Sequence, residues 1–306
     1  MGQWGRMGQA TSSDAWTIGR LLHWTTGWLA QHGVDQPRLS AELLIARAMD
    51  CKKIELYTRF EVVAAPERLA TLRELVRQAA EHAPIAYLVG RKEFYSLDFE
   101  VTPAVLIPRP ETETLVQKTI DLCRSAPDAA RRILDLGTGS GCVAISIARY
   151  VPAAELTAID ASAEAVEVAR RNAERHGLTG RIRFAVSDWL NLDAEWIPPG
   201  GFDVIVSNPP YIAEREYADL PRNVREYEPR IALAGGDDGL TFYRRLASEC
   251  PGRLRPGGSI LVEIGAGQHE AVRAIFDAAK AFTHVGTYRD PADPHDRVIH
   301  VRLGAD

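Results

Sequence analysis

The chain has 306 residues, 46% of them hydrophobic and 25% charged, a length and composition that allow two folded domains and exclude a disordered or fibrous class. Its formal net charge is -5 and no long basic run occurs, which argues against broad binding to nucleic-acid phosphates. No apolar stretch reaches membrane-spanning length, and the N-terminus lacks the apolar core of a signal peptide. We therefore predict a cytoplasmic protein without a membrane segment.

The N-terminal part is predicted to be helical. Residues 1–14 read as a poorly ordered extension, and their unusual start leaves the initiation site open. Over residues 15–85, apolar side chains recur at three- and four-residue spacing in segments such as "RLLHWTTGWLAQHG", which predicts a small helical bundle. Trp24 and Trp28 lie four residues apart, on one face of a helix, and are expected to be core residues.

A change of pattern follows the helices. Residues 86–107 alternate between apolar and polar side chains and then become rich in proline, which predicts a strand or hairpin linking two domains. From 108 to 306, strand-like and helix-like segments alternate, as expected for an α/β domain with a largely parallel sheet. Two strand-like stretches near the end have no helix between them, so at least one is expected to pair antiparallel.

No metal site is predicted. The four cysteines form no CxxC pair and have no close histidine partner, which is typical of reduced structural thiols. His295 and Asp296 lie in a Pro/Asp-rich turn with nearby carboxylates, but a solvated turn fits that composition better than a metal site.

A glycine-rich loop directly follows the strand "RRILDL" and opens a helix. Glycines there permit a tight turn and a close approach of backbone to a ligand, with free N–H groups at the helix start. A dinucleotide would favour a third glycine where Cys142 stands, and the lysine of a phosphate-binding P-loop is absent. S-adenosylmethionine, which has an adenosine but no phosphate, fits better. The predicted cofactor-binding loop is Gly137, Thr138, Gly139, Ser140 and Gly141.

Two acidic residues at the ends of the next strands support a cofactor site. Asp160 follows the loop by about twenty residues, where a carboxylate can accept both ribose hydroxyl protons. Asp188 can accept from the adenine amino group, and the indole of Trp189 can cover the ring. Singly, such an aspartate is also a helix N-cap. At successive strand ends they predict one binding edge.

The stretch "VIVSNPPYIAE" ends the fourth strand at the same edge. The prolines Pro209 and Pro210 end the strand and fix Asn208 relative to Tyr211, although a plain strand terminator followed by a loop would have the same form. The Asn208 carbonyl, the adjoining backbone carbonyl and the Tyr211 ring suit a planar group that bears an NH₂. A glutamine amide and the exocyclic amine of adenine or cytosine both satisfy that description. Methyl transfer to such a nitrogen requires orientation and electrostatics but no metal.

Together, "GTGSG", Asp160, "DW" and "NPPY" resemble the amino-methyltransferases, and "EFYSLDFEVTPAVLIPRPETE" resembles the HemK/PrmC family of peptide chain release factor glutamine methyltransferases. The resemblance implies a helical domain that recognises the release factor, a hairpin linker and a seven-stranded, Rossmann-like class I methyltransferase domain. It also implies methylation at N5 of the glutamine in the Gly-Gly-Gln motif of class I release factors, which modulates translation termination.

The resemblance also assigns residue roles. Gly137 to Gly141, Asp160, Asp188 and Trp189 would bind S-adenosylmethionine, Asn208, Pro209, Pro210 and Tyr211 would hold the glutamine, and Asn208 would contact both. Arg109 and Glu111 of "RPETE" either line the site or form a structural corner.

Other functions stay open at this point. The alternatives are an N6-adenine nucleic-acid methyltransferase, a ribosomal-protein glutamine methyltransferase, whose pattern lacks "RPETE", and a non-catalytic module that docks on translation factors. The release factor is the expected partner, with no direct DNA binding, and the protein is expected to be a monomer.

Overall fold

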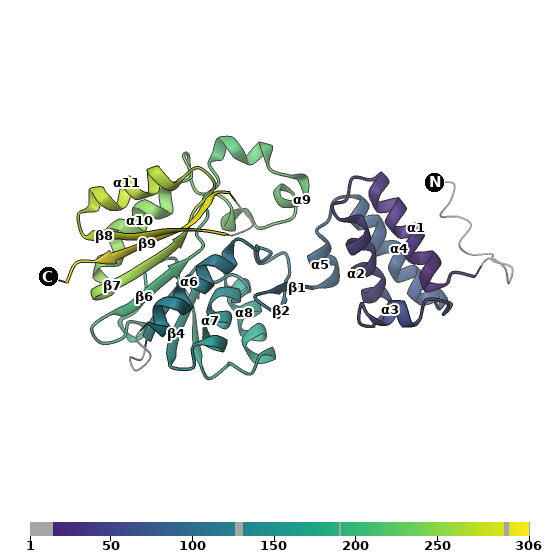
Figure 1. Ribbon diagram of the computed structural model, residues 1–306, viewed down its shortest axis with the longest axis horizontal. Helices are drawn as coiled ribbons and strands as arrows, with labels where there is room; N and C mark the ends of the chain where they lie inside the picture. Colours follow the sequence, from purple (N-terminus) through teal and green to yellow (C-terminus); the bar gives the residue numbers. More distant parts are fainter. Residues whose placement is uncertain (1–14, 126–130, 190, 291–293, 306) are drawn as a thin grey trace. The chain divides into compact units, whose positions relative to one another are not determined.

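The computed structural model describes residues 15–125, 131–189, 191–290 and 294–305, so the predicted extension 1–14 lies outside the described residues. The chain divides into two compact units, Met1–Gly90 and Arg91–Asp306, each considered by itself below. In Figure 1 the first unit is drawn in purple to blue and the second in teal to yellow. Among the described residues, no helix is long and apolar enough to cross a membrane.

The first unit is a helical bundle, as the spacing of apolar residues predicts. Thr17 caps the first helix by accepting a hydrogen bond from the backbone N–H of Arg20, and prolines begin the second and fourth helices, where a missing N–H costs nothing. Trp24 and Trp28 stack at a centroid distance of 5.4 Å and are partly buried at the border of the core. The helices are α1 (Ile18–Gln31), α2 (Pro37–Met49), α3 (Glu55–Thr58), α4 (Pro66–Ala80) and α5 (Ile85–Val89).

The second unit begins with an antiparallel hairpin of β1 (Arg91–Phe94) and β2 (Leu97–Glu100). Its two turn residues, Tyr95 and Ser96, both have positive φ angles, as the tightest hairpin turns require. The hairpin of the predicted fold is therefore present, and its strand β2 contacts a helix of the second unit, α8 (Ala163–Arg175).

A seven-stranded sheet forms the centre of the second unit, in the order β5-β4-β3-β6-β7-β9-β8. The pairs from β5 to β7 are parallel, whereas β9 is antiparallel to both neighbours. The largely parallel sheet and its antiparallel end are thereby confirmed. The strands are β3 (Arg131–Leu136), β4 (Ala154–Asp160), β5 (Ile182–Val186), β6 (Phe202–Ser207), β7 (Leu254–Glu263), β8 (Phe282–Arg289) and β9 (Asp296–Leu303).

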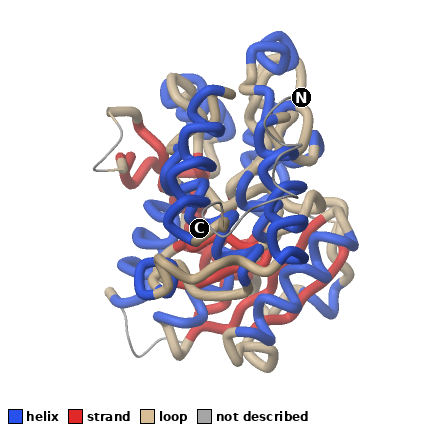
Figure 2. Tube along the Cα trace, turned by 90° about the vertical axis from the view of Figure 1, so that its right-hand side faces the viewer, coloured by secondary structure: helices blue, strands red, loops and turns tan. Residues whose placement is uncertain are grey.

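Helices cover both faces of this sheet, and alternate residues of each strand face opposite cores. Ile133 of β3 packs with α6, α7 and α8, whereas its neighbour Leu134 belongs to the cluster that contains α10 and α11 (Figures 1 and 2). The helices not yet given are α6 (Thr112–Arg124), α7 (Cys142–Tyr150), α9 (Arg222–Arg225), α10 (Thr241–Glu249) and α11 (His269–Ala279), with short 3₁₀ turns η2 (Ala194–Trp196), η3 (Glu214–Asp219), η4 (Arg230–Ala232) and η5 (Cys250–Gly252).

Candidate active site

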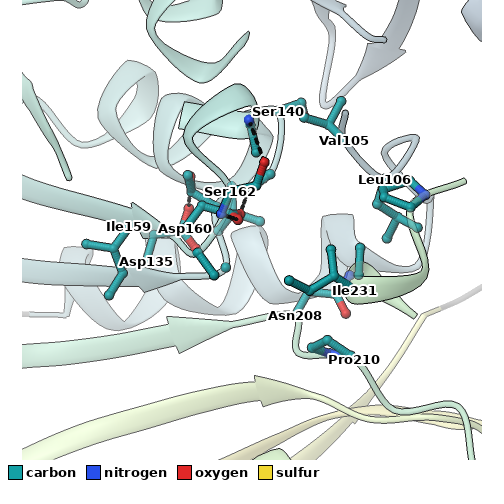
Figure 3. Close-up of a pocket in the computed structure, with 18 of the residues that line it drawn as sticks. Val105, Leu106, Asp135, Ser140, Ile159, Asp160, Ser162, Asn208, Pro210 and Ile231 are labelled. Atoms are coloured by element: carbon teal, nitrogen blue, oxygen red, sulfur yellow. Dashed lines mark hydrogen bonds between the residues drawn. The ribbon is translucent and has the colours of Figure 1, made fainter. Parts of the chain in front are cut away.

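The carboxyl ends of the parallel strands surround a cavity of about 1100 Å³, open mouth included. Figure 3 shows Asp160 and Asn208 projecting toward it, with Val105, Leu106 and Ile231 along another wall. Of the residues predicted for the site, nine line this cavity: Gly137, Thr138, Gly139, Ser140, Asp160, Asp188, Trp189, Asn208 and Pro210.

Three predicted residues lie outside that lining. Gly141 is packed inside the fold, where a Cβ would lie only 2.9 Å from the Ile145 side chain and 3.1 Å from the Ala169 side chain. Pro209 is buried. Tyr211 lines a second cavity, which shares Leu106, Arg109 and Asn208 with the first. Asn208 thus lies where the two cavities meet.

The glycine loop presents bare backbone to the first cavity. Gly137 and Gly139 have φ angles of 73° and 55°, which residues with a Cβ rarely adopt, and a Cβ at either would meet no atom within 4 Å. The loop is anchored because the N–H groups of Gly137 and Thr138 both donate to the carbonyl of Ile159, at 2.9 Å. The open space therefore lies on the side of the loop where a ligand can approach the backbone.

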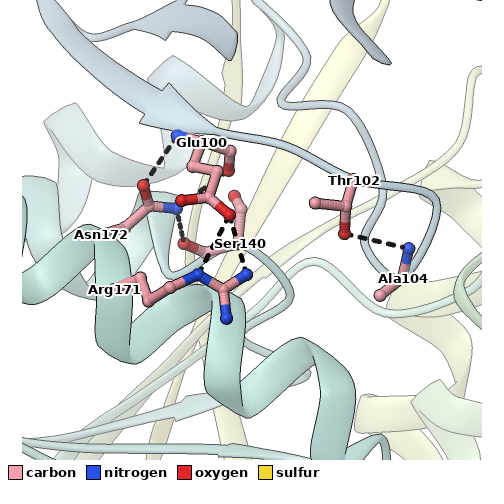
Figure 4. A network of polar contacts seen from close by, with 6 residues as sticks. All are labelled: Glu100, Thr102, Ala104, Ser140, Arg171 and Asn172. Carbon is pink, nitrogen blue, oxygen red and sulfur yellow. Dashed lines mark hydrogen bonds and ion pairs between the residues drawn. The ribbon is translucent and has the colours of Figure 1, made fainter. Parts of the chain in front are cut away.

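A buried amide behind the loop was not predicted from the sequence. Asn172 of α8 donates to the carbonyl oxygens of Ser140 (2.9 Å) and Glu100 (3.0 Å) and accepts from the N–H of Glu100 (2.7 Å), as Figure 4 shows. Arg171 adds an ion pair to the Glu100 carboxylate at the surface. One side chain thus joins the glycine loop, α8 and the end of the hairpin.

The Asp160 carboxylate organises the next turn. Its Oδ2 accepts from the N–H of Gly139 and its Oδ1 from the N–H of Ser162, both at 2.9 Å. Each oxygen keeps a lone pair for a further donor, as binding to two hydroxyl groups requires. Burial raises the pKa of Asp160 above its ordinary value, and the backbone hydrogen bonds oppose that rise.

At the end of β5 the two predicted residues differ in environment. Asp188 is exposed, whereas Trp189 is buried and has a φ angle of 59°. The Trp189 ring lies 4.9 Å from that of Phe242, and the Arg245 guanidinium lies over it at 5.3 Å. The indole is therefore partly occupied by protein neighbours, so only the part that reaches the cavity is available to a ligand.

Asp135 is a cavity residue that the sequence reasoning missed, although an acidic residue within the strand "ILDL" was a signal. It is 1% exposed, and its Oδ2 accepts from the Thr138 hydroxyl (2.7 Å) and the N–H of Ala144 (3.2 Å). Burial raises its pKa to about 7, and the two hydrogen bonds oppose the rise. The carboxyl can therefore change its charge near neutral pH.

An ion pair between the partly exposed Arg109 and the buried Glu228 fixes the wall that contains "RPETE". The Arg109 guanidinium donates to Glu228 at 2.5 Å, and the other Glu228 oxygen accepts from the N–H of Ile107 at 3.2 Å. Glu228 precedes Pro229 and Ile231, which line the cavity. Arg109 thus lines both cavities and also has a structural partner, whereas Glu111 lines neither.

The segment after Asn208 is held on several sides. The Asn208 side-chain NH₂ donates to the Thr112 hydroxyl oxygen at 3.1 Å. Ile212 exchanges backbone hydrogen bonds with Leu233 (2.9 Å) and Gly235 (2.8 Å), and the Gln268 side chain donates to the carbonyl of Tyr211 at 3.0 Å. This anchoring, together with the two prolines, keeps Asn208 and Tyr211 in a fixed relation.

The charges of the first cavity favour a cation without phosphate. Three carboxyl groups line it, those of Asp135, Asp160 and Asp188, and the one basic residue among its described lining, Arg109, is paired with Glu228. S-adenosylmethionine carries a sulfonium, an ammonium, a carboxylate and a planar adenine ring. Its two positive groups suit the carboxyls, its carboxylate suits backbone N–H groups, and the faces of its adenine ring suit apolar side chains such as Ile159 and Val105. The residues present therefore fit this cofactor.

The sheet order, the glycine loop after its first parallel strand and the cavity beyond it define a class I methyltransferase, with S-adenosylmethionine as the methyl donor. Family models agree with this class: "Methyltransferase small domain" matches residues 113–223 and "PrmC N-terminal domain" matches residues 20–90. The chain belongs to the family of release factor glutamine methyltransferases, as the following relatives show.

The curated "Release factor glutamine methyltransferase" of Geobacter sulfurreducens is 42% identical over 95% of this chain and 98% of that protein. Its counterpart in Rhodopirellula baltica is 40% identical over 97% and 99% of the two chains. Among solved structures, the hMettl16 catalytic domain in complex with MAT2A 3'UTR hairpin 1 has a TM-score of 0.54 at 16% identity, covering 76% of this chain and 81% of that chain. The last likeness shows the fold alone.

Proposed function

We propose that this enzyme transfers the methyl group of S-adenosylmethionine to the side-chain amide nitrogen, N5, of the glutamine in the Gly-Gly-Gln motif of a class I release factor. The observation that carries the proposal is the position of Asn208, which lines both cavities and has its NH₂ group engaged by Thr112. Its carbonyl oxygen is therefore the group left to accept a hydrogen bond from a substrate. The relatives named as release factor glutamine methyltransferases support glutamine over adenine.

In the proposed cofactor site, each residue has a defined task. The backbone of Gly137 to Ser140 approaches the ligand, the Asp160 carboxylate accepts from the ribose hydroxyls, and Asp188 accepts from the adenine amino group while Trp189 contacts the ring. Gly141 acts indirectly, because its packing fixes the loop. The cofactor supplies a methyl group made electrophilic by its sulfonium.

On the substrate side, the chain's own carbonyls prepare a weak nucleophile. Asn208 Oδ1 and the backbone carbonyl of Pro209 accept the two amide protons, which favours electron density on nitrogen and directs its lone pair to the methyl group. Among the described residues, none donates a hydrogen bond to that Pro209 carbonyl. Tyr211 fixes the plane of the amide, and Pro210 keeps the acceptors in register.

Further expectations belong to the same proposal. The helical segment 15–85 recognises the release factor, 86–107 forms the linker and 108–306 carries the methyltransferase domain. The enzyme acts as a monomer in the cytoplasm and does not bind DNA directly, which agrees with the net charge of -5.

The test is transfer of a labelled methyl group from S-adenosylmethionine to a purified class I release factor. We expect label on the Gly-Gly-Gln glutamine and none on a release factor in which that glutamine is replaced. A folded, cofactor-binding enzyme that leaves the release factor unlabelled, or that methylates an adenine-containing oligonucleotide at a comparable rate, would contradict the proposal.

A further inference from the structure

Glu263 is a buried carboxyl that the proposed mechanism does not use. It is the last residue of β7, next to β6, whose end leads into Asn208. Its side chain is 1% exposed, and its Oε2 is buried without a hydrogen-bond partner among the described residues. Burying a carboxyl with an unsatisfied oxygen is costly, so its retention beside the substrate site calls for a functional reason.

The carboxyl reaches the site through one hydroxyl. The Thr112 hydroxyl oxygen accepts from the NH₂ of Asn208 at 3.1 Å, and the same hydroxyl lowers the pKa of Glu263, as a donor to that carboxylate would. Thr112 is 2% exposed and is the first residue of α6, within the "RPETE" stretch. Thr112 thus lies between the buried carboxyl of Glu263 and the proposed substrate acceptor, Asn208, and its hydroxyl interacts with both.

The direction of these hydrogen bonds is set by the carboxylate. A threonine hydroxyl has one proton, and an ionised carboxylate can only accept, so the proton of Thr112 is committed to Glu263. The Thr112 oxygen is then left to accept, and only the NH₂ end of the Asn208 amide can donate to it. The amide carbonyl must therefore point the other way.

We propose that Glu263 and Thr112 are positioning residues that orient the Asn208 amide, with its carbonyl oxygen directed to the substrate nitrogen. The proposal rests on the function proposed above and adds to it the device that selects between the two orientations of an amide. When either residue is replaced, the Asn208 amide can adopt both orientations, although its carbonyl oxygen is still present to accept from the substrate.

The charge of Glu263 is sensitive to pH. Burial raises its pKa to about 7, against the hydrogen bond from Thr112 and the positive charges of Arg297 on β9 and of Arg109, while Glu111 raises it further. Its other titratable neighbours are Tyr211 after β6, Cys142 of α7 and Tyr243 of α10. The Tyr243 hydroxyl donates to the Glu263 backbone carbonyl at 3.0 Å. A protonated Glu263 can donate to Thr112, so the selection of one amide orientation is lost below this pKa.

The first test measures transfer by the full-length enzyme carrying Glu263→Gln, Thr112→Val or both. We expect each single variant to lower kcat about tenfold, the worth of one well-placed hydrogen bond, with the cofactor Kd changed less than about twofold. The double variant should be no slower than the slower single variant, because both changes interrupt the same link from Glu263 through Thr112 to Asn208. Thr112→Ser keeps the hydroxyl and should restore most of kcat.

Controls separate positioning from stability. Thr119→Val makes the same replacement at another fully buried threonine of α6, which bonds only the Leu115 carbonyl, and should leave kcat unchanged. Glu263→Gln should unfold at the same or a higher urea concentration than the parent protein, since it removes a buried charge. A lower unfolding midpoint with unchanged kcat would assign Glu263 a structural role and overturn the proposal.

A second test needs no turnover. The side-chain NH₂ signals of Asn208, assigned in an NMR spectrum by their loss in Asn208→Ala, should shift with a midpoint near pH 7 in the parent protein and not in Glu263→Gln. Signals that are equally insensitive to pH in both proteins would overturn the inference even if methyl transfer proceeds. Failure of methyl transfer with the expected NMR behaviour would instead contradict the proposed function.

Discussion

The Asp160 carboxylate combines two tasks that can be separated by substitution. It already accepts from the N–H groups of Gly139 and Ser162, so its removal loosens the glycine loop as well as the proposed ribose contact. We predict that Asp160→Ala weakens binding of S-adenosylmethionine roughly 100-fold, about 3 kcal/mol, as measured by calorimetry. Asp160→Asn keeps one acceptor oxygen and should lose less.

The matched control for Asp160 is Glu164→Gln, which alters an exposed carboxylate at the start of α8. It should leave the cofactor Kd within about twofold, because the charge of an exposed carboxylate is screened by solvent and salt. Equal affinity of Asp160→Ala and the parent protein would show that the ribose assignment is wrong.

Gly235 permits the backbone after Asn208 to lie where it does. A Cβ at Gly235 would come within 2.8 Å of the Tyr211 Cα and 2.9 Å of the Pro210 carbonyl oxygen, both backbone atoms that cannot rotate away. We predict that Gly235→Ala displaces the substrate-holding segment and lowers kcat about 100-fold, with a nearly unchanged cofactor Kd.

Kinetics with a release factor substrate, paired with calorimetry, check this prediction. Gly180→Ala is the control, because a Cβ there meets nothing within 4 Å. A Gly235→Ala enzyme with the parental kcat would mean that Pro210 and Tyr211 tolerate a shift, and would remove the argument for rigidity.

At the scale of elements, the stability contributed by the buried Asn172 can be compared with that of the exposed Arg171, because both side chains join α8 to Glu100. Asn172→Leu leaves the N–H of Glu100 and the Ser140 carbonyl without partners, so we predict a loss of roughly 3 kcal/mol in unfolding free energy. Arg171→Gln removes an ion pair whose members are 47% and 26% exposed, and should cost less than about 1 kcal/mol.

Urea denaturation of the two variants tests this comparison, and calorimetry adds a functional readout. Because Asn172 holds the carbonyl of Ser140 in the glycine loop, Asn172→Leu should also weaken cofactor binding, whereas Arg171→Gln should not. Similar losses of stability in both variants would contradict the greater weight given to the buried hydrogen bonds.

At the scale of the whole molecule, the sequence predicts which strand-end residues meet at the site, because parallel strands bring their carboxyl ends to one edge of the sheet. That rule alone places Gly137, Asp160, Asp188 and Asn208 together. It works because each of these residues carries a local signal: a glycine cluster, an acid after an apolar run, or an amide before prolines.

The residues that support this edge carry no such signal. Asn172 bonds Glu100 across 72 positions, Thr112 meets Asn208 across 96, and Arg109 pairs with Glu228 across 119. A buried asparagine in a helix and a threonine at a helix start look ordinary until the fold brings their partners near. The tertiary contacts, rather than local pattern, determine which polar residues are buried and paired.

Three buried groups contribute to the dependence of overall stability on pH. Burial raises the pKa of Asp135 from 3.8 to about 7 and that of Glu263 from 4.5 to about 7, so the folded state binds more protons than the unfolded state between these values. As pH rises through that range, each carboxyl therefore lowers the unfolding free energy by roughly 3 to 4 kcal/mol, and this effect levels off above about pH 8. Burial lowers the pKa of His300 from 6.5 to about 4. The unfolded state therefore binds more protons at this residue between those values, so His300 raises the unfolding free energy as pH rises through them.

Two substitutions separate the contribution of the buried carboxyls to pH-dependent stability from that of the surface charges. Both hydrogen bonds to Asp135 go to Oδ2, so Asp135→Asn can keep them with its carbonyl oxygen while removing the titration. We predict that Asp135→Asn and Glu263→Gln are each more stable than the parent protein at pH 8 and nearly equal to it at pH 4, measured by urea unfolding at a series of pH values. Glu155→Gln, at an exposed position of β4, should follow the parent curve. Parallel curves for all four proteins would show that neither buried carboxyl titrates in the predicted range, because a proton bound only in the folded state must change the slope.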